Sequence, residues 1–149
     1  MVPWCAYNRR IYKQTYYGIR DVLAPLVKEK VVSVLPIQSV AFDKPWLLEV
    51  CPASTLKRMK LYRPYKGTNK DIKDIDKKKN RKYILGKIEN TGLIKIRSSA
   101  LRATIIDNPG GDALDSVIAA LATFRALLNL ARSSVPKTTP YMLEGYVYV

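Results

Sequence analysis

Hydrophobic residues fall into short runs along the chain, and their spacing predicts the secondary structure. In the segment 112–131 apolar residues recur at helical spacing and form a broad stripe, which predicts an amphipathic helix with its apolar face in the core. A shorter helix is predicted over 19–27, where Pro25 implies a late start or a kink. The segment 46–50 is a short apolar run before Pro52, which is typical of a buried strand.

The remaining elements are shorter. We expect helices over 53–61 and 81–90, whereas the segment 93–106 is compatible with a helix or with a strand followed by a helix. The segment 145–149 is rich in β-branched and aromatic residues, which favours a strand. Residues 62–80 contain a proline, a glycine and a run of lysines, so we expect a mobile basic connection there.

Size and composition predict one globular domain over 1–149. The chain has 149 residues, of which 48% are hydrophobic, and a chain of this length buries about 70% of the surface of its unfolded form. It has two cysteines, too few for a disulfide framework, and its first ten residues do not resemble a secretory signal, so we expect a cytoplasmic protein. No membrane span is expected, because Asp115, Arg125 and Asn129 interrupt the most apolar window.

Positive charge is concentrated in one part of the chain. The 26 basic and 12 acidic residues give a net charge of +14, and 16 of the basic but only 4 of the acidic residues lie between Lys57 and Arg102. Such a surface attracts polyanions by releasing their counterions, so we expect DNA or RNA as the partner, and an anionic membrane surface as the second candidate. Residues expected to contact nucleic acid are Lys57, Arg58, Lys66, Lys77, Lys78, Lys79 and Arg81.

Two alternatives apply to this basic region. The run of three lysines at 77–79 is also compatible with an ordinary solvated surface. Tyr62 and Tyr65 could form a platform on which bases stack, but most tyrosines pack with the hydroxyl at the surface.

Three carboxylates are candidates for metal chemistry. Asp112 and Asp115 lie three residues apart on one face of the longest predicted helix, where they could share a divalent cation. Glu49 lies within the apolar run 46–50, where an unpaired charge is costly. The chain has no histidine, which excludes serine–histidine triads and histidine-ligated zinc, and oxygen ligands alone suit Mg²⁺ or Mn²⁺.

Each carboxylate also has a structural alternative. Asp112 could be the N-cap of the helix, with Asp115 completing a capping box and both complementing the helix dipole. Glu49 could lie at a strand edge and pair with one of the nearby lysines.

A series of short motifs resembles a known family. In order along the chain they are the segments 47–58, 65–67, 81–85, 112–115 with Ala119 and Ala120, and 144–148. Over roughly residues 46–149 the chain resembles the family of predicted nucleases listed as domain of unknown function 429, which has an RNase H-like fold. Its last helix is also similar to that of RuvC-type resolvases. The resemblance implies an α/β fold, or α+β if the sheet is truncated: the C-terminal part of an RNase H-like domain, with a small sheet and three to five helices.

The resemblance also implies an activity. Glu49, Asp112 and Asp115 would be catalytic carboxylates that hold Mg²⁺ or Mn²⁺ for hydrolysis of a phosphodiester bond. Members of the family begin with a strand that carries a further catalytic aspartate, and no such strand precedes Glu49 in this chain. The alternative function is therefore a nucleic-acid-binding or scaffold remnant without catalysis.

The same missing strands predict self-association. The strand 46–50 would be left with an open edge, and two chains could pair there as a homodimer. The alternative is that residues 1–45 supply replacement strands.

Overall fold

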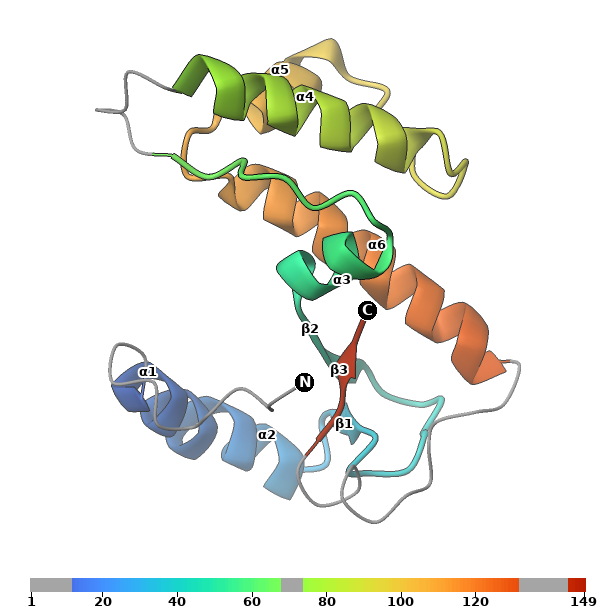
Figure 1. Ribbon diagram of the computed structural model, residues 1–149. Helices are drawn as coiled ribbons and strands as arrows, with labels where there is room; N and C mark the ends of the chain where they lie inside the picture. The colour runs from blue at the N-terminus through green and yellow to red at the C-terminus, as the bar shows by residue number, and fades with distance from the viewer. Residues whose placement is uncertain (1–11, 68–73, 132–144) are drawn as a thin grey trace. The chain divides into compact units, whose positions relative to one another are not determined.

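The computed structural model describes residues 12–67, 74–131 and 145–149 (Figure 1). The chain divides into two compact units: unit 1 comprises Met1–Leu48 and Thr138–Tyr146, and unit 2 comprises Glu49–Lys137 and Val147–Val149. A single domain over 1–149 stays a prediction, since two compact units can belong to one domain or to two.

Unit 1 begins with an unbroken helical segment. It consists of α1 (Tyr12–Tyr17), the π-helix η1 (Gly18–Leu23) and α2 (Ala24–Lys28). The predicted helix over 19–27 is confirmed, although the segment begins earlier, at Tyr12. Pro25 lies in the first turn of α2, where its missing N–H is tolerated, and the wider π-turn precedes it.

Three parallel strands form a small sheet in the order β1-β2-β3. They are β1 (Ser33–Leu35), β2 (Trp46–Val50) and β3 (Val147–Tyr148). The predictions of a strand over 46–50 and of a terminal strand are confirmed. β1 is not predicted by the sequence, because three residues are too few to show an alternating pattern.

β2 has a partner on each side. Leu47 lies opposite Val34 of β1, and Glu49 lies opposite Val147 of β3. The prediction that β2 lacks neighbouring strands is therefore corrected. Among the described residues, β1 pairs only with Trp46–Leu48 and β3 only with Glu49–Val50, and self-association stays a prediction. The alternative, in which residues 1–45 contribute a strand, is the one that the structure confirms.

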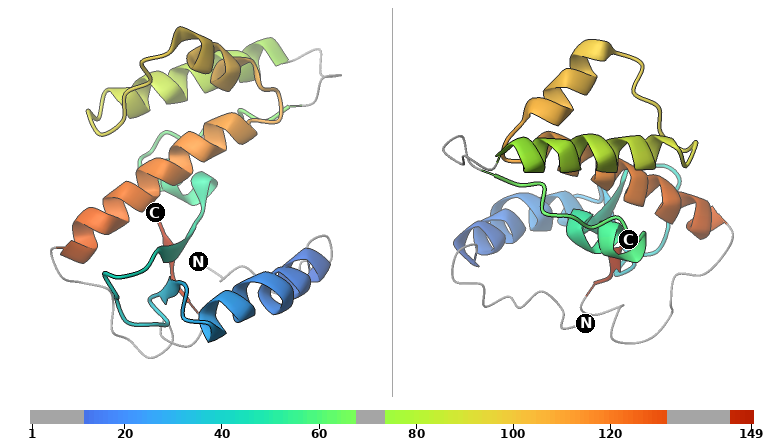
Figure 2. Two further views of the ribbon diagram at one scale, coloured as in Figure 1. Left: turned by 180° about the vertical axis from the view of Figure 1, so that it is seen from behind. Right: turned by 45° about the horizontal axis from the view of Figure 1, so that its top comes forward.

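Unit 2 is built around its longest helix, α6 (Asp112–Ala131), which contacts the other three helices of the unit and β3. The views in Figure 1 and Figure 2 show α4 and α5 on one side of α6 and α3 on another. These helices are α3 (Pro52–Arg58), α4 (Asp74–Glu89) and α5 (Ser99–Asp107). If the unbroken segment of unit 1 counts as one helix, the described residues contain five helical segments and a small parallel sheet, which confirms the predicted α/β class.

The start of α4 differs from the prediction, and α3 covers Pro52–Arg58 where a helix over 53–61 is predicted. α4 begins at Asp74 rather than at Arg81, so the C-terminal part of the predicted connection over 62–80 is helical. Its first turns contain lysines, which are good helix formers, and an ion pair between Lys79 and Asp76 at 3.7 Å. Residues 68–73 of that connection lie outside the described residues.

The segment 93–106, for which the sequence allowed two structures, is helical only in its C-terminal part. α5 begins after Ser98, whose hydroxyl oxygen accepts a hydrogen bond from the backbone N–H of Leu101 at 3.2 Å. This is an N-cap, and it satisfies one of the free donors of the first turn.

The core of unit 2 contains side chains from all four of its helices. Fully buried residues are Leu56 of α3, Ile84, Leu85 and Ile88 of α4, Ile105 of α5, and Leu114, Ile118 and Leu121 of α6. The apolar stripe predicted for α6 is therefore confirmed as a core face. Burial of each such side chain contributes ~2 kcal/mol, and together they position the segment that precedes α6.

Among the helices that the structure describes, none has an apolar stretch of the length that a membrane span needs.

Candidate functional site

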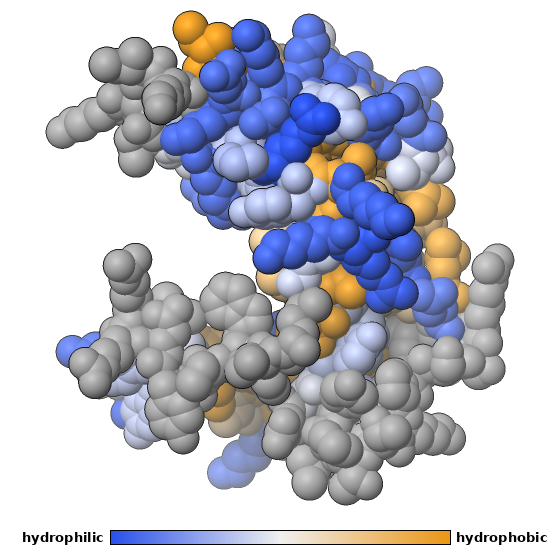
Figure 3. Space-filling model, in the orientation of Figure 1, coloured by the Kyte–Doolittle hydropathy of each residue, from blue (hydrophilic) through white to orange (hydrophobic). Residues whose placement is uncertain are grey.

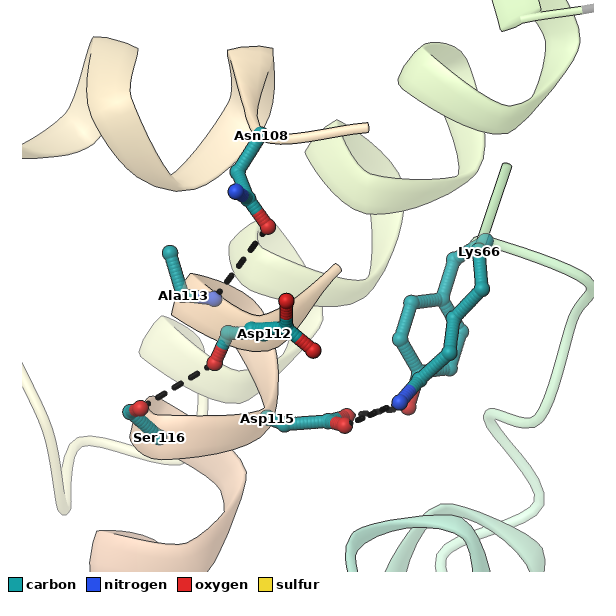
Figure 4. Close-up of polar contacts among 7 residues, drawn as sticks. Lys66, Asn108, Asp112, Ala113, Asp115 and Ser116 are labelled. Carbon is teal, nitrogen blue, oxygen red and sulfur yellow. Dashed lines mark hydrogen bonds and ion pairs between the residues drawn. The ribbon is translucent and has the colours of Figure 1, made fainter. Parts of the chain in front are cut away.

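The candidate site lies at the start of α6, where the two predicted aspartates occur (Figure 4). The loop before α6 lies beside the extended segment that follows α3. Gly67 joins the two, because its backbone N–H donates to the carbonyl of Pro109 at 2.8 Å. Asp112 and Asp115 thus come close to residues that lie far from them in the sequence.

Gly111 allows this close approach. Its φ is +76°, which is in the left-handed region, and a Cβ there would lie 3.0 Å from two ring carbons of Tyr65 and 3.1 Å from the Cγ of Lys66. The backbone conformation therefore favours glycine, and a side chain there would require the Tyr65 ring or the Lys66 side chain to shift.

The start of α6 is capped by an asparagine. The Oδ1 of Asn108 accepts a hydrogen bond from the backbone N–H of Ala113 at 3.4 Å (Figure 4). The Asp115 N–H donates to the Gly111 carbonyl at 2.9 Å. Asp112 is the first residue of the helix and is exposed. The alternative in which Asp112 is the N-cap is thus wrong, because Asp112 already lies within the helix. Both aspartates lie in the first turn, where they complement the helix dipole.

Asp115 is bound by two donors. Its Oδ1 accepts a hydrogen bond from the Tyr65 hydroxyl, and its Oδ2 forms an ion pair with the Lys66 ammonium. The Tyr65 side chain is buried, and this burial, together with the hydrogen bond to Asp115, raises the pKa of Tyr65 well above its ordinary value of 10.0. Tyr65 therefore stays protonated and donates to Asp115 over the whole neutral range of pH.

Arg81 has a structural role that the sequence does not reveal. Its side chain is 0% exposed, and its guanidinium donates to the carbonyl of Ile106 at 2.7 Å, of Tyr65 at 2.8 Å and of Pro109 at 3.4 Å. The prediction that Arg81 contacts nucleic acid is therefore corrected, because a buried guanidinium cannot reach a phosphate. Arg81 instead holds the extended segment against the loop before α6.

The three predicted carboxylates do not form a metal site in this arrangement. Among the described residues there is no group of three or more acidic or cysteine side chains that could hold a metal ion. Exposure alternates along β2, and Glu49 is on its exposed side, so its charge needs no compensating site. The Lys66 ammonium already neutralises Asp115. A cation at Asp115 would have to replace the Lys66 ammonium, and binding of Mg²⁺ or Mn²⁺ by these carboxylates stays a prediction.

The other predicted nucleic-acid contacts are at the surface or partly so. Lys57 and Arg58 are exposed in the last turn of α3. Lys78 pairs with Asp107 at 2.6 Å and Lys79 pairs with Asp76, whereas Lys77 is half-buried. Part of the predicted basic surface is therefore neutralised by neighbouring acids.

The aromatic residues beside this surface differ from the prediction. Tyr65 is 3% exposed and cannot stack on a base, whereas Tyr62 is 49% exposed. Sequence reasoning missed Tyr83, which is partly exposed and has the Arg63 guanidinium 3.8 Å from its ring centroid. The sequence feature that could have identified Tyr83 is its spacing of four residues from Lys87, which places both on one face of a helix. The Lys87 ammonium lies 5.6 Å from the Tyr83 ring centroid.

Comparison of the chain with family models, curated proteins and solved structures gave no match. The resemblance to predicted nucleases of RNase H-like fold stays a prediction.

Proposed function

We propose that unit 2 binds nucleic acid through exposed basic residues of α3, of α4 and of the segment between them, as a binding module without catalysis. The observation that supports this proposal is a set of exposed cations that no described carboxylate neutralises. They are Lys57, Arg58, Lys60, Arg63, Lys82 and Lys87, none of which forms an ion pair within the described part of the chain. In the view of Figure 3, hydrophilic side chains cover the face of α4 that is turned to the viewer.

Such cations favour contacts to the phosphate backbone. Each contact between a cation and a phosphate releases condensed counterions, so it stabilises the complex without reading the sequence of bases. Lys66, Lys78 and Lys79 have acidic partners, so binding a phosphate would first require them to give up an ion pair. We therefore assign the main contribution to the cations without an acidic partner, and Lys57, Arg58 and Lys82 represent them in the test below.

The test is the salt dependence of binding to a fluorescein-labelled DNA duplex, measured by fluorescence anisotropy. The triple variant Lys57→Gln, Arg58→Gln, Lys82→Gln is compared with Lys13→Gln, Lys28→Gln, Lys30→Gln, which removes the same charge from exposed positions of unit 1. The first variant should bind more weakly and lower the slope of log K against log [salt] by about 2.7, since each lost contact removes about 0.9. A salt-independent affinity, or equal losses in the two variants, would contradict the proposal.

Hydrolysis of the bound nucleic acid by Glu49, Asp112 and Asp115 is the competing function, and it has its own test. The labelled substrate is incubated with the protein in Mg²⁺ or Mn²⁺, and we expect no cleavage. Asp112→Asn is the informative variant, because Asp112 is exposed and takes no part in the contacts of Asp115 with Tyr65 and Lys66. Cleavage that disappears in this variant while binding persists would restore the nuclease interpretation.

A further inference from the structure

Two partly exposed tyrosines of unit 2 lie beside cations. The Lys57 ammonium is 5.3 Å from the ring centroid of Tyr62, and the Arg63 guanidinium is 3.8 Å from that of Tyr83. The exposed fractions are 49% for Tyr62 and 36% for Tyr83. A ring of this kind offers a surface on which another flat, electron-rich group can stack.

The extended segment after α3 connects these tyrosines. Tyr62 and Arg63 are consecutive in it, and the next residue, Pro64, accepts a hydrogen bond from the Asn80 side chain of α4 at 2.7 Å. Tyr83 follows Asn80 by three residues on α4, and Lys87 follows Tyr83 by four, so the three share one face of the helix. The segment therefore runs along this face, and Figure 2 shows it beside α4.

We infer that Lys57, Tyr62, Arg63, Tyr83 and Lys87, here called the tyrosine–cation row, bind a single-stranded nucleic acid. The inference rests on the proposed function and adds the kind of nucleic acid. Bases stack on the rings of Tyr62 and Tyr83, and the phosphates between them contact the neighbouring cations. A duplex cannot bind in this way, because its bases are paired and stacked on one another.

The cation beside each ring is compatible with stacking. A guanidinium is flat and packs against the face of an aromatic ring, and it can still donate hydrogen bonds from its edge. Arg63 thus holds the Tyr83 ring in place and keeps donors for a phosphate. Alternating aromatic rings and cations are the composition of grooves that bind single strands without sequence preference.

Unit 1 provides a matched control. Tyr16 and Tyr17 are 57% and 49% exposed, and the Arg20 guanidinium lies 5.3 Å and 4.7 Å from their ring centroids. However, Arg20 also pairs with Asp21 at 2.5 Å, so this cation is neutralised. We expect no contribution to binding from these tyrosines.

The experiment measures the affinity of the full chain for fluorescein-labelled oligo(dT) and oligo(U) of about 20 nucleotides and for a duplex of the same length. Tyr62→Ala and Tyr83→Ala should each weaken single-strand binding about tenfold. Both should change duplex binding less than about twofold and leave the salt slope unchanged, since no phosphate contact is lost. Tyr62→Phe and Tyr83→Phe should retain the affinity, because stacking needs the ring and not the hydroxyl. Tyr16→Ala is the control and should bind like the unchanged protein.

Several outcomes would overturn the inference. Equal losses for single strand and duplex would show that the tyrosines act through the fold, and so would a loss in the phenylalanine variants. Tighter, tyrosine-dependent binding to vesicles of phosphatidylcholine and phosphatidylserine would assign the row to a membrane surface instead. If the unchanged protein binds nucleic acid with the expected salt dependence, and the tyrosine variants bind single strands with the same affinity as the unchanged protein, only this inference fails. If no nucleic acid binds at all, the proposed function fails as well.

Discussion

The hydrogen bond between the Tyr65 hydroxyl and Asp115 joins the extended segment to the first turn of α6. The Asp115 carboxylate is partly shielded from water and accepts this bond from the buried Tyr65. Loss of the bond therefore leaves the carboxylate with one hydrogen-bond donor fewer. At the scale of single residues, this contact and the glycine beside it determine how firmly the site is held.

We predict that Tyr65→Phe lowers the free energy of unfolding in urea at pH 7 by about 2 kcal/mol. The variant should also change the response to alkali. The raised pKa of Tyr65 means that the unfolded chain loses the proton near its ordinary pKa of 10.0, while the folded chain still keeps it. Stability from this source is complete below pH 10 and falls as the pH rises further, and Tyr65→Phe should remove that decline. Tyr62→Phe, at an exposed ring, is the control and should change neither quantity.

Gly111→Ala should destabilise the chain more than Gly92→Ala. Both glycines have a positive φ, +76° for Gly111 and +73° for Gly92, so both changes strain the backbone by about 1 kcal/mol. A Cβ at Gly92 meets nothing within 4 Å, whereas one at Gly111 meets the Tyr65 ring at 3.0 Å. We expect Gly111→Ala to cost about 2 kcal/mol more in urea denaturation. Equal losses would show that the Tyr65 ring can give way.

The residues of the site could be predicted only in part. The sequence places Asp112 and Asp115 on one face of a helix, and the structure has them in its first turn. The partner of Asp115 could not be predicted, because Tyr65 lies 50 positions earlier and no local pattern connects the two. The structural role of Arg81 could not be predicted either. Its acceptors are backbone carbonyls, and because every residue has one, no sequence pattern marks them.

At the scale of elements, Glu89 connects α4 with α5. Its Oε1 accepts a hydrogen bond from the Ile96 backbone N–H at 3.1 Å and pairs with the Arg102 guanidinium. The hydrogen bond from Arg102 lowers the pKa of Glu89 below its ordinary value of 4.5.

This shift predicts a response to acid. A carboxylate with a lowered pKa in the folded state contributes stability above its ordinary pKa, and this contribution is lost as the pH falls through the folded-state value. We therefore expect Glu89→Gln to reduce the loss of stability between about pH 5 and pH 3, as measured by urea denaturation at a series of pH values. Glu29→Gln, at an exposed position of unit 1, serves as the control. An unchanged acid response in Glu89→Gln would contradict the role of the Arg102 pair.

The start of α4 gives a prediction about binding. Lys78 and Lys79 are each paired with an aspartate, whereas Lys57 and Lys82 have no described carboxylate partner. The triple variant Lys77→Gln, Lys78→Gln, Lys79→Gln should therefore lose less affinity for nucleic acid than Lys57→Gln, Arg58→Gln, Lys82→Gln, although both remove three charges. Fluorescence anisotropy at matched salt compares them. The opposite order would make the lysine run the main contact.

Elements with a long or regular pattern could be predicted, and short ones could not. α6 has many apolar positions at helical spacing, and β2 is a continuous apolar run, so both were found. β1 has three residues, and its identity as a strand depends on pairing with β2. The early start of α4 depends on polar residues that turn rules assign to a loop, although lysine is a good helix former and Lys79 pairs with Asp76 one turn earlier.

At the scale of the whole molecule, the positive charge is concentrated in one of the two units. The excess of basic residues between Lys57 and Arg102 belongs to unit 2, as do the tyrosine–cation row and the network around Asp115. The composition predicts the kind of partner, but it cannot predict which cations stay exposed, since that depends on the acids that tertiary structure brings beside them. The division into two units is also not visible in the sequence, where no linker separates them.

The position of Arg81 has a consequence for how unit 2 opens. One buried guanidinium donates to carbonyls at Tyr65, Ile106 and Pro109, so none of these stretches can detach without leaving a buried charge short of acceptors. Partial opening is therefore costly, and the stretches should separate from α4 in a single cooperative event. Amide hydrogen exchange would report this: the N–H of Gly67, the N–H of Asn108 and those in the first turns of α6 should share one opening free energy. In Arg81→Met the same amides should exchange with separate free energies, because the residue that couples them is gone.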